Sequence, residues 1–292
     1  MSCVYRRENN KVEVYVYMQL SNEDHVRLAK VIKAKYGLNL TEKKYLIESR
    51  LTNYVLDCGF DNFTEYLESV YADRSGIEMT NIISRLTTNY TYFMRESEHF
   101  RHFTEVFLMD AESRIEDKDL RIWSAGCSFG NEPYNLAMCL HEYFGDDADN
   151  WDSRILATDI SFNALRMAKQ GVFAEQALQE LPESWIRKYF NRHVNGTYQV
   201  SEELRNDVVF KYHNLMEPIG FKKKFDLIVC RNVMIYFDEQ TKKELIDRFY
   251  DATEPGGYLY IGHAESAPKE MKYEYVQPAI YRKPLKGDEE NE

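Results

Sequence analysis

The chain has 292 residues, of which 44% are hydrophobic, so it is long enough for one or two domains with a buried core. Its formal net charge of −11 argues against a general nucleic-acid-binding protein, because binding phosphates requires a basic surface. Five scattered cysteines, with no long apolar run and no signal-peptide pattern, indicate a cytoplasmic protein without a disulfide framework, a metal site or a membrane-inserted segment.

The N-terminal region divides into a short leader and a helical domain. In residues 1–20, valine occupies every second position of the segment 12–17. This alternation suits either a short strand or an unstructured leader, and the sequence does not decide between them. Residues 21–89 carry helical periodicity with a cap at Ser21 and a stop at Gly37. The four helices are expected at 21–37, from near Thr41 to 55, over 63–70 and near 76–86.

One segment of this acidic chain is basic. Residues 26–56 hold seven lysines and arginines and only two acidic residues. Such a cluster can form a docking face for an acidic partner, or it can be a solvated helix surface with no partner. The residues alone leave both interpretations open.

Residues 120–140 read as a buried strand, a tight turn and an amphipathic helix. Gly126 and Gly130 lie in the turn, in an order that places backbone N–H groups and a helix N-terminus beneath a nucleotide-like ligand. The pattern is GxxxG without a following Lys-Ser or Lys-Thr, so a phosphate-binding P-loop is not indicated. By itself the loop is equally compatible with an ordinary strand-to-helix turn.

A second strand, at 154–160, carries Asp159 near its carboxyl end. A carboxylate there accepts hydrogen bonds from ribose hydroxyls in nucleotide-binding α/β sheets, although Asp159 could instead cap the helix that starts near Ser161. Further strands are expected at 225–230 and 257–262. Strands that alternate with helices predict a mainly parallel α/β sheet with its site at the carboxyl ends of the strands.

An insertion is predicted at 172–207, because this stretch is longer than a simple crossover needs. It holds a helix-like run at 181–190 and an Asn195-Gly196 pair, a strong hairpin signal. We therefore expect a small antiparallel β subdomain. The acidic tail, 285–292, is expected to be disordered.

Five segments together resemble the chemotaxis-receptor protein-glutamate methyltransferases, the CheR family. They are LTTNYTYFMRESEHF (86–100), WSAGCSFGNEPYNLAM (123–138), ATDIS (157–161), HNL (213–215) and FDLIVCRNVMIYFD (225–238), in the family's order. The N-terminal region agrees only in pattern. The resemblance implies a class I S-adenosylmethionine-dependent methyltransferase fold, Rossmann-like, at 90–284, preceded by the all-helical domain.

The resemblance also implies an activity and its partners. The protein would transfer the methyl group of S-adenosylmethionine to glutamate side chains on the cytoplasmic helices of chemoreceptors, giving methyl esters and S-adenosylhomocysteine. It would act in the cytoplasm as a monomer. Two alternatives remain: a related methyltransferase with another substrate, and a non-catalytic cofactor-binding adaptor. The Asn/Asp-Pro-Pro-Tyr signature of amide and adenine N-methyltransferases is missing after the 225–230 strand.

Methylating a carboxylate demands little acid–base chemistry, because a glutamate with a pKa of about 4.3 is already ionised at neutral pH. The family places Arg95 and Tyr236 beside the transferred methyl group, and a guanidinium suits the task of holding a carboxylate. Arg95 could instead pair with Glu98, and Tyr236 could be simple core packing. The resemblance assigns cofactor binding to Asn89, Thr91, Arg95, Gly126, Glu132, Asp159, Asn214, Leu215, Arg231 and Asn232.

The chain departs from the family pattern at Met94, Phe129 and Asn131. None of these three positions belongs to the catalytic or cofactor-binding residues that the resemblance assigns. For substrate docking we expect Lys30, Lys33 and Lys44 of the basic segment to steer an acidic receptor helix. Some family members dock a receptor C-terminal peptide on the β insertion through a longer loop. The compact turn at Asn195-Gly196 therefore predicts that such tethering is absent here.

Overall fold

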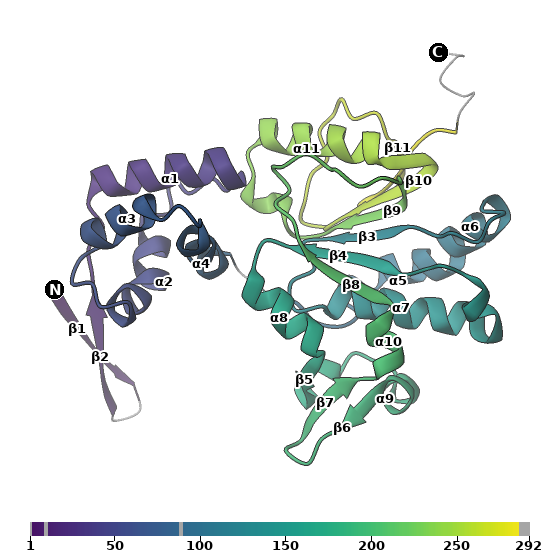
Figure 1. Ribbon diagram of the computed structural model, residues 1–292, viewed down its shortest axis with the longest axis horizontal. Helices are drawn as coiled ribbons and strands as arrows, with labels where there is room; N and C mark the ends of the chain where they lie inside the picture. The colour runs from purple at the N-terminus through teal and green to yellow at the C-terminus, as the bar shows by residue number, and fades with distance from the viewer. Residues whose placement is uncertain (1, 9–10, 88–89, 286–292) are drawn as a thin grey trace. The chain divides into compact units, whose positions relative to one another are not determined.

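The computed structural model in Figure 1 describes residues 2–8, 11–87 and 90–285. The chain forms two compact units, Met1–Thr88 and Asn89–Glu292. No helix in the described part of the chain is both long enough and apolar enough to cross a membrane.

The first unit begins with a hairpin and continues with four helices (Figure 1). Strands β1 (Ser2–Glu8) and β2 (Lys11–Tyr17) pair antiparallel, which answers the question that the sequence of residues 1–20 left open. The helices are α1 (Asn22–Tyr36), α2 (Lys44–Asp57), α3 (Phe63–Ala72) and α4 (Ile77–Leu86). Their apolar faces supply fully buried residues such as Leu28, Ile32, Ile47, Leu51, Leu67 and Ile82.

Local signals set the ends of α1 but not the start of α2. The Ser21 side chain accepts a hydrogen bond from Asp24 N, and Gly37 takes the left-handed φ of 73° that ends a helix, as predicted. The prediction that α2 starts near Thr41 is wrong, because α2 starts at Lys44. Asn39 Oδ1 accepts hydrogen bonds from the N and Oγ1 of Thr41, and this side-chain turn holds the backbone out of a helix.

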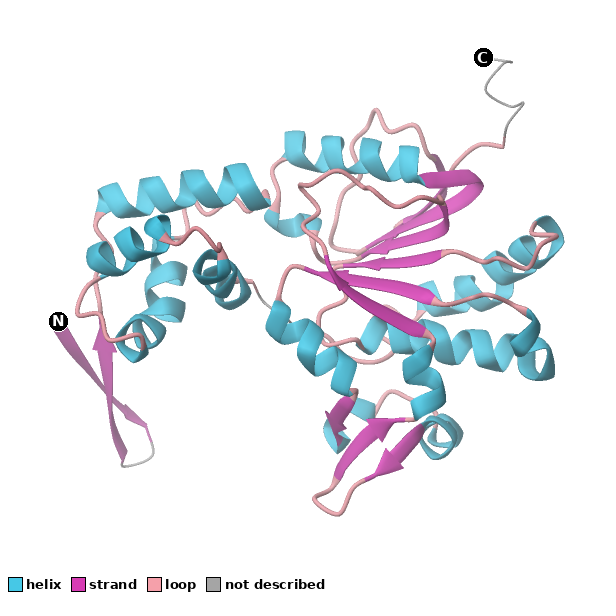
Figure 2. Cartoon of the chain, viewed as in Figure 1, coloured by secondary structure: helices cyan, strands magenta, loops and turns pink. Residues whose placement is uncertain are grey.

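The second unit is built on a seven-stranded sheet with the order β11-β12-β10-β9-β3-β4-β8. Figure 2 draws the strands in magenta and the helices around them in cyan. The five strands from β10 to β8 run parallel, and β12 and β11 add an antiparallel edge. The strands are β3 (Ile122–Ala125), β4 (Ile155–Asp159), β8 (Val208–Tyr212), β9 (Phe225–Cys230), β10 (Thr253–Ile261), β11 (Glu274–Gln277) and β12 (Ile280–Arg282). The predicted mainly parallel sheet is confirmed.

Alternate residues of the central strand β3 face different helices, as the pleat of a strand requires. The Trp123 ring packs edge-on against Phe249 of α11, whereas Ile122 belongs to the core that includes Leu136 of α7. Strand β9 is buried along its whole length, as expected for a parallel strand covered on both faces. The helices of this unit are α5 (Glu98–His102), α6 (Leu108–Arg114), α7 (Asn131–Phe144), α8 (Phe162–Gln170), α9 (Glu183–Tyr189), α10 (Glu202–Asn206) and α11 (Glu239–Ala252).

The predicted insertion is a three-stranded antiparallel sheet with the order β5-β7-β6. Its strands are β5 (Val172–Ala174), β6 (Phe190–Arg192) and β7 (Thr197–Val200). The Asn195-Gly196 pair lies in the turn between β6 and β7, where Gly196 has a φ of 79° and Asn195 Oδ1 accepts from Thr197 N. The antiparallel insertion is therefore confirmed.

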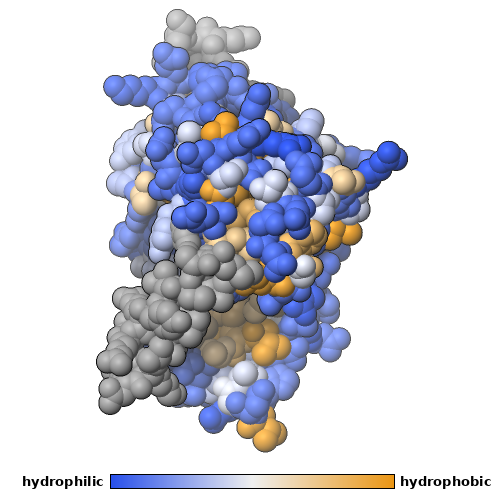
Figure 3. All heavy atoms as spheres, turned by 90° about the vertical axis from the view of Figure 1, so that its left-hand side faces the viewer, coloured by the Kyte–Doolittle hydropathy of each residue, from blue (hydrophilic) through white to orange (hydrophobic). Residues whose placement is uncertain are grey.

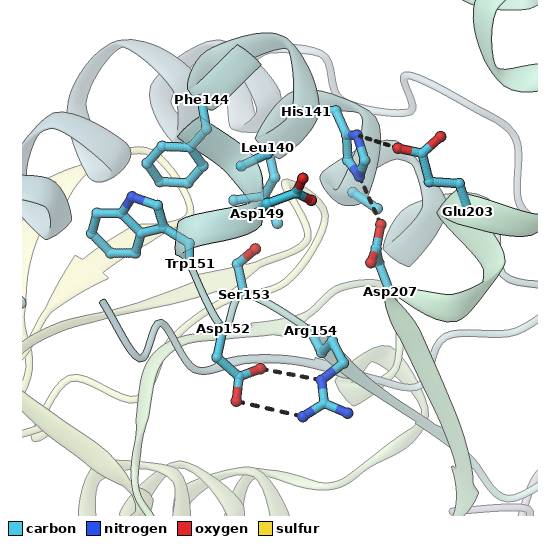
Figure 4. Close-up of a pocket in the computed structure, with 12 residues that line it drawn as sticks. Leu140, His141, Phe144, Asp149, Trp151, Asp152, Ser153, Arg154, Glu203 and Asp207 are labelled. Atoms are coloured by element: carbon cyan, nitrogen blue, oxygen red, sulfur yellow. Dashed lines mark hydrogen bonds and ion pairs between the residues drawn. The ribbon is translucent and has the colours of Figure 1, made fainter. Parts of the chain in front are cut away.

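A pocket lies at the amino edge of the sheet, between α7, the segment before β4 and α10 (Figure 4). His141 Nε2 lies 2.7 Å from Asp207 Oδ2, and His141 Nδ1 lies 3.8 Å from Glu203 Oε1. The hydrogen bond to Asp207, aided by nearby negative charge and opposed by burial, raises the pKa of His141. Asp207 directly precedes β8, so this pocket is at the sheet edge opposite the predicted site.

The His141–Asp207 contact should stabilise the second unit at low pH, and this contribution is lost as pH rises from about 6.5 through the raised pKa of His141. The lowered pKa values of His99, His102 and His213 act in the opposite direction, so the contribution of His141 is read as the difference between wild type and His141→Gln, which should lose less stability, or gain more, as pH rises. Urea unfolding followed by tryptophan fluorescence isolates the unit, since Trp123, Trp151 and Trp185 all lie in it.

The exposed His193 provides the matched control, and His193→Gln should keep the wild-type pH dependence. An unchanged pH dependence in His141→Gln would show that the His141–Asp207 contact does not link protonation to folding.

Candidate functional site

The carboxyl ends of five parallel strands meet at one edge of the sheet, and the predicted cofactor-binding residues beyond residue 120 lie there or in the adjoining loop and helix. Gly126 follows β3, and the loop leads to Glu132 in the first turn of α7. Asp159 ends β4, and the segments after β8 and β9 carry the other members. Those members are Asn214 and Leu215 after β8, and Arg231 and Asn232 after β9.

The glycine loop is shaped by the protein's own packing. Gly126 and Gly130 have φ values of 91° and 89°, which L side chains rarely adopt. A Cβ added to Gly126 would lie 2.4 Å from Val233 Cγ2, and one added to Gly130 would lie 3.0 Å from Ala168 Cβ. The sequence left open whether these glycines make room for a ligand or only form a strand-to-helix turn, and contacts with neighbouring side chains are enough to explain both of them.

Ser128, between the two glycines, connects the loop to β4. Its φ is 49°, and its backbone N–H donates to Asp159 Oδ2 at 2.8 Å. Its Oγ atom is buried and has no hydrogen-bond partner among the described residues. A buried hydroxyl without a hydrogen-bond partner reduces the stability of the folded state. The Ser128 hydroxyl, just before α7, is therefore available for a hydrogen bond to a ligand.

Asp159 is 8% exposed and binds backbone N–H groups with both of its oxygens. Its Oδ1 accepts from Ser161 N at 2.8 Å, while the Ser161 side chain itself caps α8 through Ala164 N. The alternative in which Asp159 caps that helix is therefore wrong. Burial raises the pKa of Asp159, and the N–H groups of Ser161 and Ser128 oppose that shift. A carboxylate has about four acceptor positions, so it can still accept from hydroxyl groups.

Arg231 is the buried cation of the site, with a side chain 3% exposed. Its Nη1 lies 3.2 Å from Glu132 Oε2, its Nε lies 3.3 Å from Glu96 Oε2, and its Nη2 donates to the carbonyl of Arg95. Ser124 Oγ on β3 donates to the other oxygen of Glu132 at 2.7 Å. Glu132, which the resemblance assigned to cofactor binding, is thus already paired with a guanidinium.

The two carboxylates that contact Arg231 have pKa values shifted in opposite directions. Burial raises the pKa of Glu132, and the charge of Arg231 only partly opposes it. Burial also acts to raise the pKa of Glu96, but hydrogen bonds from His99 and Asn232 and the charge of Arg231 hold it well below its usual range. Glu96 therefore stays ionised beside Arg231.

Arg95 lies in a turn with unusual backbone angles, flanked by Met94 and Glu96 with φ values of 58° and 54°. Met94 N donates to Asn135 Oδ1 of α7 at 2.7 Å, which fixes the turn to the sheet domain. Arg95 Nη1 donates to the carbonyl of Tyr90 at 2.6 Å. The alternative pairing of Arg95 with Glu98 is not found, because Glu98 pairs with Arg101.

Tyr236 ends a 3-10 turn, Met234–Tyr236, and is half-buried, whereas Met234 and Phe237 on either side of it are buried in the core. Thr91 is also half-buried. Asn89 lies outside the described residues. The buried Asn214 closes its own loop by accepting from Met216 N at 3.0 Å.

Glu265 was missed by the sequence argument. Its Oε2 accepts from Gly262 N at 2.6 Å and from Asn232 N at 3.0 Å, and its Oε1 accepts from Ile235 N at 3.2 Å. One carboxylate therefore fastens the segment before Tyr236 to the loop after β10. An acid just beyond a buried strand was the signal used for Asp159, and the same signal could have found Glu265.

The residues expected to dock substrate belong to the first unit. Lys30 and Lys33 on α1 are exposed, and Lys44 at the start of α2 is half-buried with its Nζ 2.7 Å from Asn22 Oδ1. The face shown in Figure 3 is mainly hydrophilic. The exposure of Lys30 and Lys33 makes both side chains accessible to a charged partner.

Comparisons with known proteins match both units. Residues 89–281 match the family described as CheR methyltransferase, SAM binding domain, and residues 23–87 match CheR methyltransferase, all-alpha domain. A chemotaxis protein methyltransferase of Borreliella burgdorferi is 41% identical over 279 residues, which cover 94% of this chain and 99% of that protein. The chemotaxis protein methyltransferase of Escherichia coli is 33% identical over 254 residues, which cover 85% of this chain and 86% of that protein.

The buried ion pairs of Arg231 predict a large effect of removing it. Arg231→Met should destabilise the second unit by about 3–5 kcal/mol, because the buried Glu96 and Glu132 then lose their cation. Arg187→Met is the control, since Arg187 and Glu183 form a surface pair with side chains 67% and 81% exposed. It should change the free energy of unfolding by less than about 1 kcal/mol.

Urea unfolding followed by tryptophan fluorescence measures both changes. Equal losses in the two variants would mean that the buried network is not needed for stability.

Proposed function

This chain belongs to the CheR methyltransferase family and is an S-adenosylmethionine-dependent methyltransferase of chemotaxis, and we propose that its substrates are glutamate side chains on the cytoplasmic helices of chemoreceptors. The observation that carries this proposal is that the likeness to chemotaxis protein methyltransferases spans both units. In this proposal the helical domain, 21–89, steers the receptor, and the domain at 90–284 transfers the methyl group.

The residues at the carboxyl edge fit S-adenosylmethionine, which supplies an electrophilic methyl group on a sulfonium. Ser128 has an unmet buried hydroxyl, and Asp159 has acceptor positions left for ribose hydroxyls. The pair formed by Glu132 and Arg231 offers one negative and one positive group side by side. That pair complements the ammonium and carboxylate groups at the methionyl end of the cofactor.

The remaining cofactor assignments follow from position along the same edge and from the family motifs. Gly126 supports the close turn after β3. Asn214 and Asn232 carry amides, which can both donate and accept hydrogen bonds. The proposed binding set also includes Asn89, Thr91, Arg95 and Leu215.

The glutamate substrate needs orientation more than activation, because its carboxylate is ionised at neutral pH. A guanidinium has five N–H donors, and one donor of Arg95 binds the Tyr90 carbonyl, so the rest of the fork can hold a carboxylate. Glu265 fixes the backbone before Tyr236, which keeps that side chain in a constant position. We therefore assign Arg95 and Tyr236 to the reacting groups.

Methyl transfer from labelled S-adenosylmethionine to purified receptor cytoplasmic fragments tests the proposal. Base-labile label, mapped to glutamates by mass spectrometry, is the expected result. Base-stable label would indicate another substrate group. Cofactor binding without any transfer would indicate a non-catalytic adaptor.

Arg95→Ala should lower kcat/KM by about ten- to a hundredfold, the range for losing a hydrogen bond to a charged group. Tyr236→Phe should lower kcat while sparing the affinity for S-adenosylhomocysteine, measured by calorimetry. Tyr275→Phe, on the exposed edge strand β11, is the control and should leave both quantities unchanged. Wild-type activity in Tyr236→Phe would show that its hydroxyl is not used.

Reversing Lys30, Lys33 and Lys44 to Glu should slow receptor methylation without changing cofactor affinity, because the receptor helices that carry methylatable glutamates are acidic. The loss should be smaller at high salt, since screening acts over about 10 Å at 0.1 M. The control reverses three exposed lysines of the second unit, Lys169, Lys222 and Lys224, and should have little effect.

Deleting the receptor's C-terminal residues should also have little effect, because the insertion has only a compact turn. A silent charge reversal together with a deletion that abolishes methylation would assign docking to the insertion instead.

A further inference from the structure

Three potential metal ligands come together beside the Arg231 network, from segments far apart in the chain. Glu96 lies just before α5, His99 lies in the first turn of that helix, and His263 follows the end of β10. Their candidate ligand atoms all lie within 4.8 Å of one another. The two imidazole rings have centroids 4.8 Å apart and are tilted by 47°.

His99 is the unusual member of this cluster. It is 2% exposed, and its Nε2 has no hydrogen-bond partner among the described residues. Its Nδ1 lies 3.4 Å from Glu96 Oε2, and one face of the ring stacks on Tyr260. A buried imidazole nitrogen without a hydrogen-bond partner calls for an explanation, and a bound ion is one.

We propose that Glu96, His99 and His263 bind one divalent transition-metal ion of the zinc type, with water in the fourth position. Two imidazoles and one carboxylate are a ligand set that zinc uses in proteins, whereas calcium and magnesium prefer oxygen ligands throughout. Ligands at about 2.05 Å from a tetrahedral ion are about 3.3 Å apart. The 3.4 Å between Glu96 and His99 already matches that spacing.

Neighbouring groups orient the proposed ligands. Asn232 Nδ2 lies 3.2 Å from Glu96 Oε1, and Arg231 Nε lies 3.3 Å from Glu96 Oε2, so the carboxylate is held by outer contacts. The charge of Arg231 is offset by Glu132. Glu265 accepts from Gly262 N and thereby fixes the chain before His263. His263 is exposed, which gives an ion a route from solvent.

The bound ion would join the start of α5 to the end of β10. It should therefore raise the Tm of the full-length protein, because a ligand that binds only the folded state stabilises it. Glu96 also contacts Arg231 and Asn232, so the ion would lie next to the proposed cofactor pocket without using any cofactor-binding side chain as its ligand.

The test titrates chelator-treated full-length protein with Zn²⁺ by calorimetry and with Co²⁺ by visible absorption. One ion per chain is expected, with the d–d bands of tetrahedral cobalt, no thiolate charge-transfer band and an upward shift in Tm. His263→Gln should weaken binding at least about tenfold and lose the Tm shift. His193→Gln, which removes an exposed histidine of the insertion, should bind as the wild type does.

Equal Zn²⁺ affinity in His263→Gln and wild type would overturn the proposal, as would a thiolate band or the absence of binding at micromolar Zn²⁺. Because His263 is exposed, its replacement should leave the fold intact, and circular dichroism before the titration checks this. His99→Gln provides a second variant and should weaken binding by a similar factor.

Discussion

Parallel pairing of β10, β9, β3, β4 and β8 is the constraint on which the site depends, because it brings five carboxyl strand ends to one edge. Residues distant in sequence are then buried side by side. Arg231 meets Glu132 and Glu96, from which it is separated by 99 and 135 positions. In such surroundings a charge needs a partner, so the sheet topology dictates the pairing of the polar residues.

The loops at this edge hold backbone strain as well as charge. Among the described residues, six non-glycine residues have positive φ, and Met94, Glu96, Ser128 and Asn232 lie in the site. Each of these backbones is held by neighbouring contacts, such as the hydrogen bond from Asn232 N to Glu265 or from Ser128 N to Asp159. Because neighbouring contacts hold these strained backbones in place, the side chains that they carry have fixed positions. Fixed positions are what a reaction that depends on orientation requires.

The two edges of the sheet offer different chemistry. At the carboxyl edge, burial raises the pKa of Asp159 and Glu265, while backbone N–H groups oppose the shift. At the amino edge, the half-buried His141 responds to Asp207 by a raised pKa. At the amino edge, protonation of His141 is therefore coupled to its contact with Asp207, whereas the carboxyl edge combines buried carboxylates with backbone N–H dipoles.

The sequence by itself determined the elements whose signals are local. The cap at Ser21, the stop at Gly37, the Asn195-Gly196 hairpin and the strand at 225–230 are encoded within a few residues, and all were found where predicted. The family motifs also indicated the fold and the activity. The start of α2 was misplaced because one side-chain turn at Asn39 outweighed the apolar periodicity.

Only the tertiary structure decided which side chains meet. Strand pairing brought Glu132 to Arg231, Val233 to Gly126 and His263 to His99. The two members of each pair are far apart in the sequence, so no local sequence pattern predicts these contacts. The edge strands β11 and β12 escaped prediction because they have only four and three residues, too few to show a period, and depend on pairing with β10. Local propensity sets the elements, but long-range packing sets the partners, because sheet register joins residues that are distant along the chain.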